Sequence, residues 1–420
     1  MMRHLLKRLI LSVLLATAAF ARAAQPGMAP VTPPGFLPTG LARPLLDQDP
    51  GVAAARAGLE VAQQEANILD SSTYEWTTKA NGQRRRLDSG PRYNEWNVGI
   101  ERPLRLPGKA AADRRIGQST IEESQARYGE ALHEAARELM NLWVDWLGAE
   151  RASELAADSL QATQSSLVAV EKRLRAGDAS KLDASVARAE LAEQRRLHND
   201  AKTQALAGWM RLSTRFPGIG QQAISLPSPL PIVQDGRAWR ERILDENDEL
   251  KALQAQLRIA EGRFDRARAE RTPDPTVGVH TGSDIGGRER YTGVTISIPI
   301  PGGARSANSA RAQAAAEMAG KDVELRRRQL GAQVASALTI AQGAYESLQI
   351  ANEGAAAMRE NAELMQRAYA LGEAELQALL LARRQQSAAM SNALQAQLTA
   401  LKAYYGLLID AHLVWDLEHD

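Results

Sequence analysis

The chain has 420 residues, with 51 basic and 50 acidic side chains, no cysteine and 18 prolines. The lack of cysteine excludes disulfide frameworks, thiolate metal sites, cysteine nucleophiles and a lipid anchor attached through an N-terminal cysteine. A formal net charge of +1 argues against a general nucleic-acid-binding protein, which usually carries a basic excess.

Residues 1–23 have the three zones of a secretory signal peptide. Basic residues precede an apolar run from Leu9 to Phe20, and Ala21-Arg22-Ala23 supplies the small residues that favour cleavage. We expect cleavage after Ala23, which removes four of the 51 basic residues and leaves 47 against 50 acidic ones. The apolar run is shorter than the roughly 20 residues that span a bilayer as a helix. Residues 24–44 contain several prolines and are expected to form an extended leader.

The remainder of the chain contains one unit twice. Landmark residues recur in the same order at an offset that drifts only from 198 to 195, among them Leu46-Asp47 with Leu244-Asp245, Val98 with Val294, and Gly177 with Gly372. This duplication predicts a first repeat at residues 45–215 and a second at residues 237–420. A linker at residues 216–236, in which prolines cluster, separates them, and we expect both repeats to form one structural unit.

Each repeat is predicted to begin with a helix, at residues 45–70 and 237–271, and to continue with two strands. The strands, near 74–80 and 94–101 and then 276–280 and 294–298, alternate apolar and polar residues. Glycine-containing turns are expected at residues 82–88 and 282–288. Ordinary hairpins that cap a helical protein are one interpretation. The alternation and the Trp and Tyr residues near the strand ends favour strands that cross a bilayer.

Four such strands cannot close a barrel, and lipid tolerates no open edge. Membrane-spanning strands would therefore require an oligomer. Two chains would give a barrel filled by side chains, whereas three would give room for a passage.

Two long proline-free tracts follow the strands, from Gly108 to Phe216 and from Gly302 to Asp420. We expect each to form a helical hairpin, with helices at 108–176 and 180–214 in the first and a return helix at 373–416 in the second. Gly177 and Gly372 would end the descending helices, and Ser180 with Asp183 resembles a capping box. An alanine-rich heptad pattern over residues 334–369 predicts a coiled-coil seam.

The lengths of these helices suggest how the wall closes. We expect helix 180–214 to be continued by helix 237–272, so that together they match the roughly 100 Å of the first descending helix. The second return helix would be continued in the same way by the first helix of the chain.

At this point the sequence resembles the TolC family of outer-membrane efflux proteins. The resemblance rests on the duplicated unit, on residues 100–104 running into Pro107-Gly108-Lys109, on the corner at 298–302, and on the tip segments around Gly177 and Gly372. The Pro-Gly-Lys corner and the compact length look most like the CzcC-type branch, which serves heavy-metal efflux.

The resemblance implies a mainly α fold with a small β part. It would be a TolC-like homotrimer with a helical barrel in the periplasm and a 12-stranded β-barrel, four strands per chain, in the lipid of the outer membrane. Such a channel receives substrate, here heavy-metal cations, from a pump of the resistance-nodulation-division class through a periplasmic adaptor protein. The implied location is the outer membrane of a Gram-negative bacterium.

By position, the turns at the helical tip would contact the adaptor and form the closed aperture. The resemblance places adaptor contacts at Gly177, Leu182, Gly372 and Leu376. Asp183 is a candidate gate acid, although a simple helix cap explains it equally well. The matching positions in the second repeat are not acidic, so Glu373 and Glu375 are the substitutes there.

Catalytic and cofactor-binding constellations are not expected. The six histidines are scattered, and no phosphate-binding loop or nucleophile elbow occurs. His412 and His419 lie near acidic residues, but we expect a solvated C-terminus rather than a metal site. Three alternatives remain at this stage: a channel for organic compounds, a channel for secreted protein, and a secreted trimeric coiled-coil scaffold without a pore.

Overall fold

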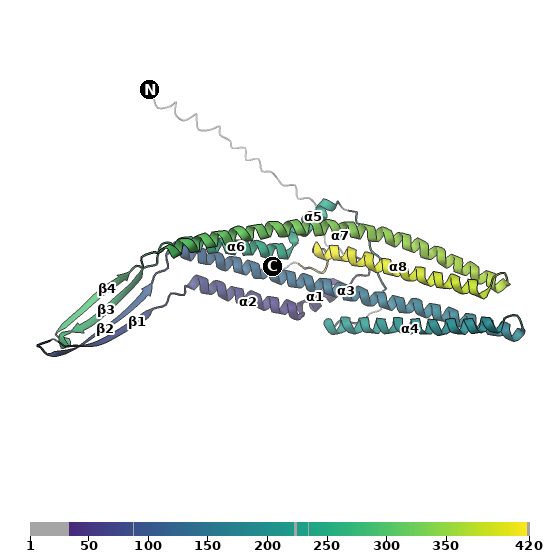
Figure 1. Cartoon of the computed structure of the whole chain (residues 1–420), viewed down its shortest axis with the longest axis horizontal. Helices are drawn as coiled ribbons and strands as arrows, with labels where there is room; N and C mark the ends of the chain where they lie inside the picture. Colours follow the sequence, from purple (N-terminus) through teal and green to yellow (C-terminus); the bar gives the residue numbers. More distant parts are fainter. Residues whose placement is uncertain (1–32, 87, 222–224, 234, 418–420) are drawn as a thin grey trace, which may run out of the picture.

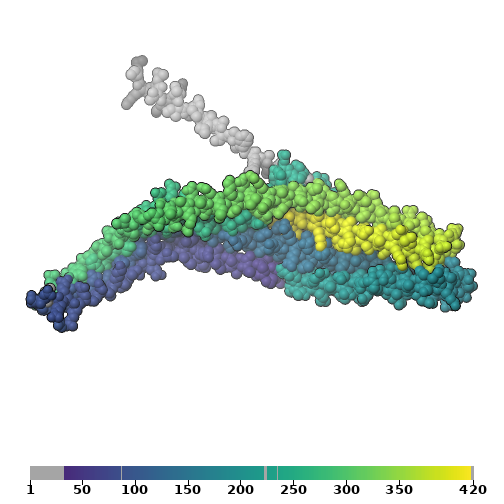
Figure 2. Space-filling model, in the orientation of Figure 1, coloured from purple at the N-terminus to yellow at the C-terminus, as the bar shows by residue number. Residues whose placement is uncertain are grey.

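The structure of the protein, a computed structural model, describes residues 33–86, 88–221, 225–233 and 235–417. The expected signal peptide at residues 1–23 lies outside the described residues. The described chain forms a long, bowed rod with a β-sheet at one end and two helical turns at the other (Figures 1 and 2). The helices are α1 (Thr39–Asp47), α2 (Pro50–Ser71), α3 (Pro107–Ala176), α4 (Lys181–Arg215), α5 (Gly236–Glu246), α6 (Asp248–Ala269), α7 (Gly303–Leu371) and α8 (Leu376–Asp410).

Helices α3 and α7 form the spine of the rod. They contain 70 and 69 residues, so each is about 105 Å long. Pro107 stands at the first turn of α3, where its missing N–H costs nothing, and neither helix contains an interior proline. The long helices expected from the proline-free tracts are therefore present. One line of the alanine-rich heptad on α7 is buried as expected: Val334, Ala341, Leu348, Ala355, Ala362 and Tyr369. On the second line of the heptad, Met358 is 38% exposed.

The shorter helices lie beside this spine in two rows. In the half near the strands the order across the rod is α2, α3, α6, α7, and in the half near the tip it is α4, α3, α8, α7 (Figure 1). Helix α4 therefore continues the line of α2, and α8 continues the line of α6. The expectation that α4 would be continued by the helix at 237–272 is wrong, because the linker carries the chain across α3 to the other side.

Side-chain caps divide the two helices that were expected at the start of the repeats. Asp49 accepts hydrogen bonds from the N–H groups of Gly51 and Val52, and Pro50 follows it, so α2 starts afresh after α1. Asn247 does the same between α5 and α6 by accepting from Leu250 N–H. The leader expected to be extended up to residue 44 is helical from Thr39, because α1 buries Ala42, Leu45 and Leu46 in the central core.

The strands form one antiparallel sheet in the order β1-β2-β3-β4. They are β1 (Thr77–Arg86), β2 (Arg92–Pro103), β3 (Thr276–Asp284) and β4 (Glu289–Ser297), with a short 3-10 turn at Ile285–Gly287. The turn expected at residues 82–88 is wrong. Strand β1 runs on to Arg86, which pairs with Arg92 of β2. The charged residues that suggested a turn are all exposed in β1, so they carry no burial penalty there.

The main hydrophobic core lies at mid-length, where the two rows of helices meet. Its largest fully buried side chains are Trp143, Trp239, Trp415, Tyr405 and Phe216. Residues 411–417 end the described chain and enter this core, so the second return helix ends at Asp410 rather than near residue 416. The expected solvated C-terminus is wrong for His412, which is 6% exposed. His419 lies outside the described residues.

Candidate functional site

The two helical turns at the tip have the same backbone geometry. Gly177 follows α3 with φ of 89° and Gly372 follows α7 with φ of 81°, a region that disfavours residues with a Cβ atom. In both turns the next residue donates its N–H to the carbonyl five residues back, at 2.8 Å for Asp178 and 2.9 Å for Glu373. The reversals predicted at these glycines are confirmed, and both lie at the same end of the rod (Figure 1).

Asp183 forms the capping box that begins α4. Its carboxylate accepts hydrogen bonds from Ser180 N–H at 3.0 Å and Ser180 Oγ at 2.8 Å, while Asp183 N–H donates to Ser180 Oγ at 3.0 Å. The second turn differs, because Glu375 occupies the cap position of α8 without a side-chain hydrogen bond. Glu373 and Glu375 are both exposed. Their role as gate acids, and that of Asp183, stays a prediction.

We expect Ser180→Ala to loosen the start of α4 by about 1 kcal/mol, because it removes the side chain that caps Asp183 N–H. Amide hydrogen exchange at residues 181–186 should then accelerate. Ser185→Ala, an exposed change within the same helix, is the matched control and should leave these rates unaltered. Equal exchange rates in the two variants would contradict the role of the cap.

The two leucines proposed as adaptor contacts lie in different environments. Leu182 is 65% exposed, whereas Leu376 is only 4% exposed. Leu376 belongs to a small core at the tip with Val170, Ala184, Ala187, Tyr369, Leu379 and Leu380. The side chain of Leu376 therefore packs inside this tip core, and an adaptor contact at Leu376 stays a prediction. An apolar residue at the first turn of a helix cannot be assigned to core or surface from one sequence.

The contact between the two hairpins, which we call the hairpin seam, was not anticipated from the sequence. On α8, Arg384 Nε donates to Glu190 Oε2 of α4 at 3.0 Å, and the guanidinium also forms an ion pair with this carboxylate, which is 4% exposed. Gln194 donates to the other oxygen of Glu190 at 3.0 Å. Nearer the tip, the guanidinium of Arg173 stacks 5.1 Å from the ring of Tyr369. Separation of the hairpins would have to break the contacts of Arg384 with Glu190 and of Arg173 with Tyr369.

A second polar network joins the strands to the helices. Lys109 Nζ lies 2.9 Å from Asp274 Oδ2, and the side chains of this pair are 3% and 9% exposed. Tyr74 donates its hydroxyl to the same oxygen at 2.5 Å, and Leu106 N–H donates to Asp274 Oδ1 at 3.1 Å. Asp274 thus links the segments before β1, before α3 and before β3. We call this group the strand junction.

The sheet has one apolar face and one polar face. Ile100, Val279 and Val294 lie opposite one another on neighbouring strands, with 40%, 54% and 72% exposure. The other face carries polar contacts, such as Lys79 Nζ to Glu101 Oε1 at 2.6 Å and His280 Nδ1 to Thr295 Oγ1 at 3.0 Å. An exposed apolar ladder backed by polar side chains suits a wall between lipid and water.

The sequence matches the outer membrane efflux protein family over residues 41–215 and 239–408. The chain belongs to this family. Outer membrane efflux proteins are channels and not enzymes. They form homotrimers in the outer membrane of Gram-negative bacteria and act with periplasmic adaptors and inner-membrane pumps.

Solved structures share the fold of this outer membrane efflux protein. A membrane protein from Pseudomonas aeruginosa superposes with a TM-score of 0.74 at 18% identity, over 91% of each chain. The open state of MtrE from Neisseria gonorrhoeae gives 0.72 at 20% identity, over 91% of this chain and 90% of that one. CmeC from Campylobacter jejuni gives 0.73 at 14% identity, over 91% and 86%. No curated protein matches the sequence.

Two further observations on the efflux protein concern membranes and metals. Within residues 33–417, apart from the undescribed gaps, no helix is both long and apolar enough to cross a membrane. In the same ranges, no three His, Asp or Glu side chains are grouped so that they could hold a metal ion.

Proposed function

We propose that three copies of this chain close into one tube, and that the tube exports heavy-metal cations delivered by a resistance-nodulation-division pump through a periplasmic adaptor. The closed tube is supported by one observation: the sheet and the two rows of helices each have two open edges. The sheet has β1 and β4 at its edges, and the helical rows have α2 or α4 at one edge and α7 at the other. Exposed strand edges within lipid are costly, so the rows must continue into neighbouring copies.

The outer edge of α7 supports this closure. An exposed line of mostly small side chains follows it at spacings of three and four: Gly343, Ser347, Ile350, Gly354, Ala357, Asn361 and Leu364. A Cβ atom added at Gly343 or Gly354 would meet nothing within 4 Å. Small residues on a long exposed helix face allow the close approach of another helix. We call this line the α7 edge, and we propose that it contacts α4 of the next copy.

Three copies fit better than two. A barrel of eight strands is filled by its own side chains, whereas twelve strands enclose a larger interior. The proposed assembly is therefore a 12-stranded β-barrel in the outer membrane above a helical barrel in the periplasm. At the tip, the turns at Gly177 and Gly372, together with the exposed Leu182, would meet the adaptor. Glu373 and Glu375 would stand beside the aperture.

The metal cargo is supported by the resemblance of the Pro107-Gly108-Lys109 corner to the CzcC-type branch. In the structure this corner begins α3 and places Lys109 in the strand junction. With the expected cleavage after Ala23, 47 basic residues stand against 50 acidic ones, and this slight acidic excess does not oppose the passage of cations.

The test is tolerance of a strain that lacks the chromosomal gene to cobalt, zinc, cadmium, nickel, copper and silver. We expect tolerance to at least one metal to fall, and the wild-type gene to restore it. Gly354→Leu should fail to restore it, because the side chain blocks the α7 edge while the protomer has space for it. Gln349→Leu, an exposed change elsewhere on α7, is the matched control and should restore tolerance.

Two results would overturn different parts of the proposal. Unchanged tolerance to all six metals, with sensitivity to organic compounds instead, would refute the metal cargo and keep the channel. Extraction of the protein from the membrane by carbonate, with no trimer that withstands detergent, would refute the channel and favour a scaffold.

A further inference from the structure

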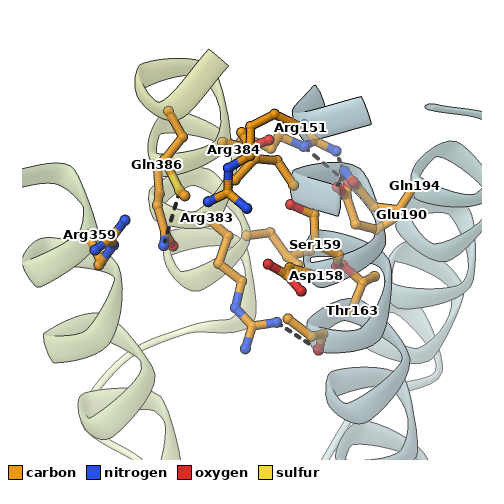
Figure 3. Close-up of a pocket in the computed structure, with 15 residues that line it drawn as sticks. Arg151, Asp158, Ser159, Thr163, Glu190, Gln194, Arg359, Arg383, Arg384 and Gln386 are labelled. Carbon is orange, nitrogen blue, oxygen red and sulfur yellow. Dashed lines mark hydrogen bonds and ion pairs between the residues drawn. The ribbon is translucent and has the colours of Figure 1, made fainter. Parts of the chain in front are cut away.

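A cavity of about 400 Å³ lies at the hairpin seam, between α3, α4, α7 and α8. Figure 3 shows basic side chains entering it from both hairpins. Four arginines line it, but only two carboxylates do: Arg151, Arg359, Arg383 and Arg384 against Asp158 and Glu190. The volume is within the range of small-molecule sites in proteins. The composition of the lining indicates an excess of positive charge.

Arg383 is the half-buried cation at the centre of this lining. Its Nη1 donates to Ala162 O at 3.0 Å and Ser166 Oγ at 2.5 Å, and its Nη2 donates to Gln366 Oε1 at 2.5 Å. All three acceptors are uncharged. Among the described residues, no carboxylate forms an ion pair with Arg383. Burial alone lowers the pKa of this guanidinium, which means that the site disfavours its charge instead of compensating it.

The internal repeat shows what Arg383 lacks. Its counterpart in the first hairpin, at the offset of 195, is Arg188, which pairs with Glu171 at 3.4 Å. The residue at the position of Glu171 in the second hairpin is Gln366. The geometry of the contact is thus repeated, but the carboxylate is replaced by an amide. The second hairpin has an arginine in the equivalent place without the negative charge that its twin possesses.

The other charges around the cavity do not make up this deficit. Arg384 is paired with Glu190, and Arg151 Nη1 lies 2.6 Å from Glu154 Oε2. Within the described chain, Arg359 has no ion pair, and neither does Asp158. Arg359 and Arg383 therefore have no ion-pair partner in the part of the chain that the structure describes, and the remaining carboxylate of the lining, Asp158, forms an ion pair with neither of them. A buried or half-buried charge without a partner is costly, so the site would gain from one more anion.

We propose that this cavity binds a small oxyanion, with carboxylate or phosphate oxygens, and that Arg383 is its principal ligand. Guanidinium groups present paired N–H donors that match such oxygens. Arg383 keeps donors that its three protein acceptors do not use. The bound anion would connect α8 to α3 and stabilise the closed seam. The site does not depend on which cargo the channel exports.

The test compares the thermal unfolding of the purified trimer in sodium phosphate, sodium succinate and sodium chloride at matched ionic strength and neutral pH. For the wild type we expect phosphate, succinate or both to raise Tm saturably by a few degrees, while chloride does not. Whichever of the two acts identifies the source of the oxygens. Titration calorimetry with the same salts gives the affinity directly.

The decisive variant is Gln366→Glu, which supplies Arg383 with the carboxylate that Arg188 already has. We expect higher stability without added oxyanion and at least about tenfold weaker oxyanion binding, because the carboxylate neutralises Arg383 and repels the ligand. Arg383→Gln should also lose the response, whatever its basal stability. Glu171→Gln is the mirrored control at the exposed pair, and it should keep the wild-type response.

Two outcomes would overturn the proposal. One is an equal response of Gln366→Glu and the wild type, which would place any binding elsewhere. The other is a wild type that responds alike to oxyanions and chloride, which would reduce the effect to ionic strength.

Discussion

Asp274→Ala is expected to lower the free energy of unfolding by about 3–5 kcal/mol, because it leaves the cation of Lys109 buried without its partner. Tyr74 and Leu106 N–H would lose their acceptor at the same time. The loss should show as a lower midpoint in guanidinium unfolding. It should also reduce the trimer recovered from membranes, since the strand junction fixes where the sheet leaves the helices.

Two comparisons make this result specific. Lys109→Met keeps the length of the apolar stem and leaves Asp274 two donors, so we expect a smaller loss of about 2 kcal/mol. Asp265→Ala removes a half-exposed carboxylate that pairs with the exposed Arg115 at 2.8 Å, and should cost less than about 1 kcal/mol. If Asp274→Ala cost no more than Asp265→Ala, the junction would not hold the strands to the helices.

Low pH should weaken the contacts of Asp274 in the strand junction. Burial raises the pKa of Asp274, but the hydrogen bonds from Tyr74, Lys109 and Leu106 outweigh it, so the pKa lies below the ordinary value of 3.8. A depressed carboxyl pKa stabilises the folded state fully above the unfolded value, and this stability is lost as pH falls through the folded pKa. The pH dependence of unfolding below about pH 4 should therefore be shallower in Asp274→Ala than in the wild type.

Trp415→Ala is the second large effect that we expect, at about 3–5 kcal/mol. Trp415 is 1% exposed, its ring stacks 4.7 Å from Phe36, and its Nε1 donates to Leu37 O at 2.7 Å. It thus joins the last described segment to the first. Without it, residues 411–417 should leave the core, and a protease should cut within them and release a C-terminal tag that the wild type retains.

Trp415→Phe separates the two parts of this contact. The ring still packs on Phe36, but the hydrogen bond to Leu37 is lost, so we expect a cost of about 1 kcal/mol and a tag that stays protected. Equal protection of the tag in Trp415→Ala and the wild type would show that other contacts hold the tail.

The sequence could predict the long helices because local rules decide them. The proline-free tracts, Gly177 and Gly372 at the reversals, and the Ser180-Asp183 box act within a few residues of one another. The start of α2 also follows a local rule, since Asp49 followed by Pro50 is a helix-start signal. The run of arginines in β1 does not predict a strand from the sequence, because charge and exposure alone do not distinguish an exposed strand from a turn.

The remaining errors arise from contacts between distant segments. Residues 411–415 and Leu417 are buried because they join a core that α1 and the segment around Phe36 share with α3, α5 and α8. Leu376 is buried because the two hairpins meet at the tip. The cavity at the hairpin seam could have been suspected from the repeat, in which Gln366 replaces Glu171. The sequence does not show that α3 lies beside α8, and this packing is what encloses Arg383 in a cavity.

The row order α4, α3, α8, α7 also determines how many kinds of contact a closed tube contains. Three copies in sequence give twelve helices with two alternating boundaries between hairpins, α3 against α8 within a chain and α7 against α4 between chains. The closed tube would contain six helical hairpins of similar shape, but only the boundary within a chain carries Arg383 and its cavity. The tube would therefore bind three oxyanions and not six. The stability of the boundary within a chain would depend on the oxyanion concentration, whereas that of the boundary between chains would not.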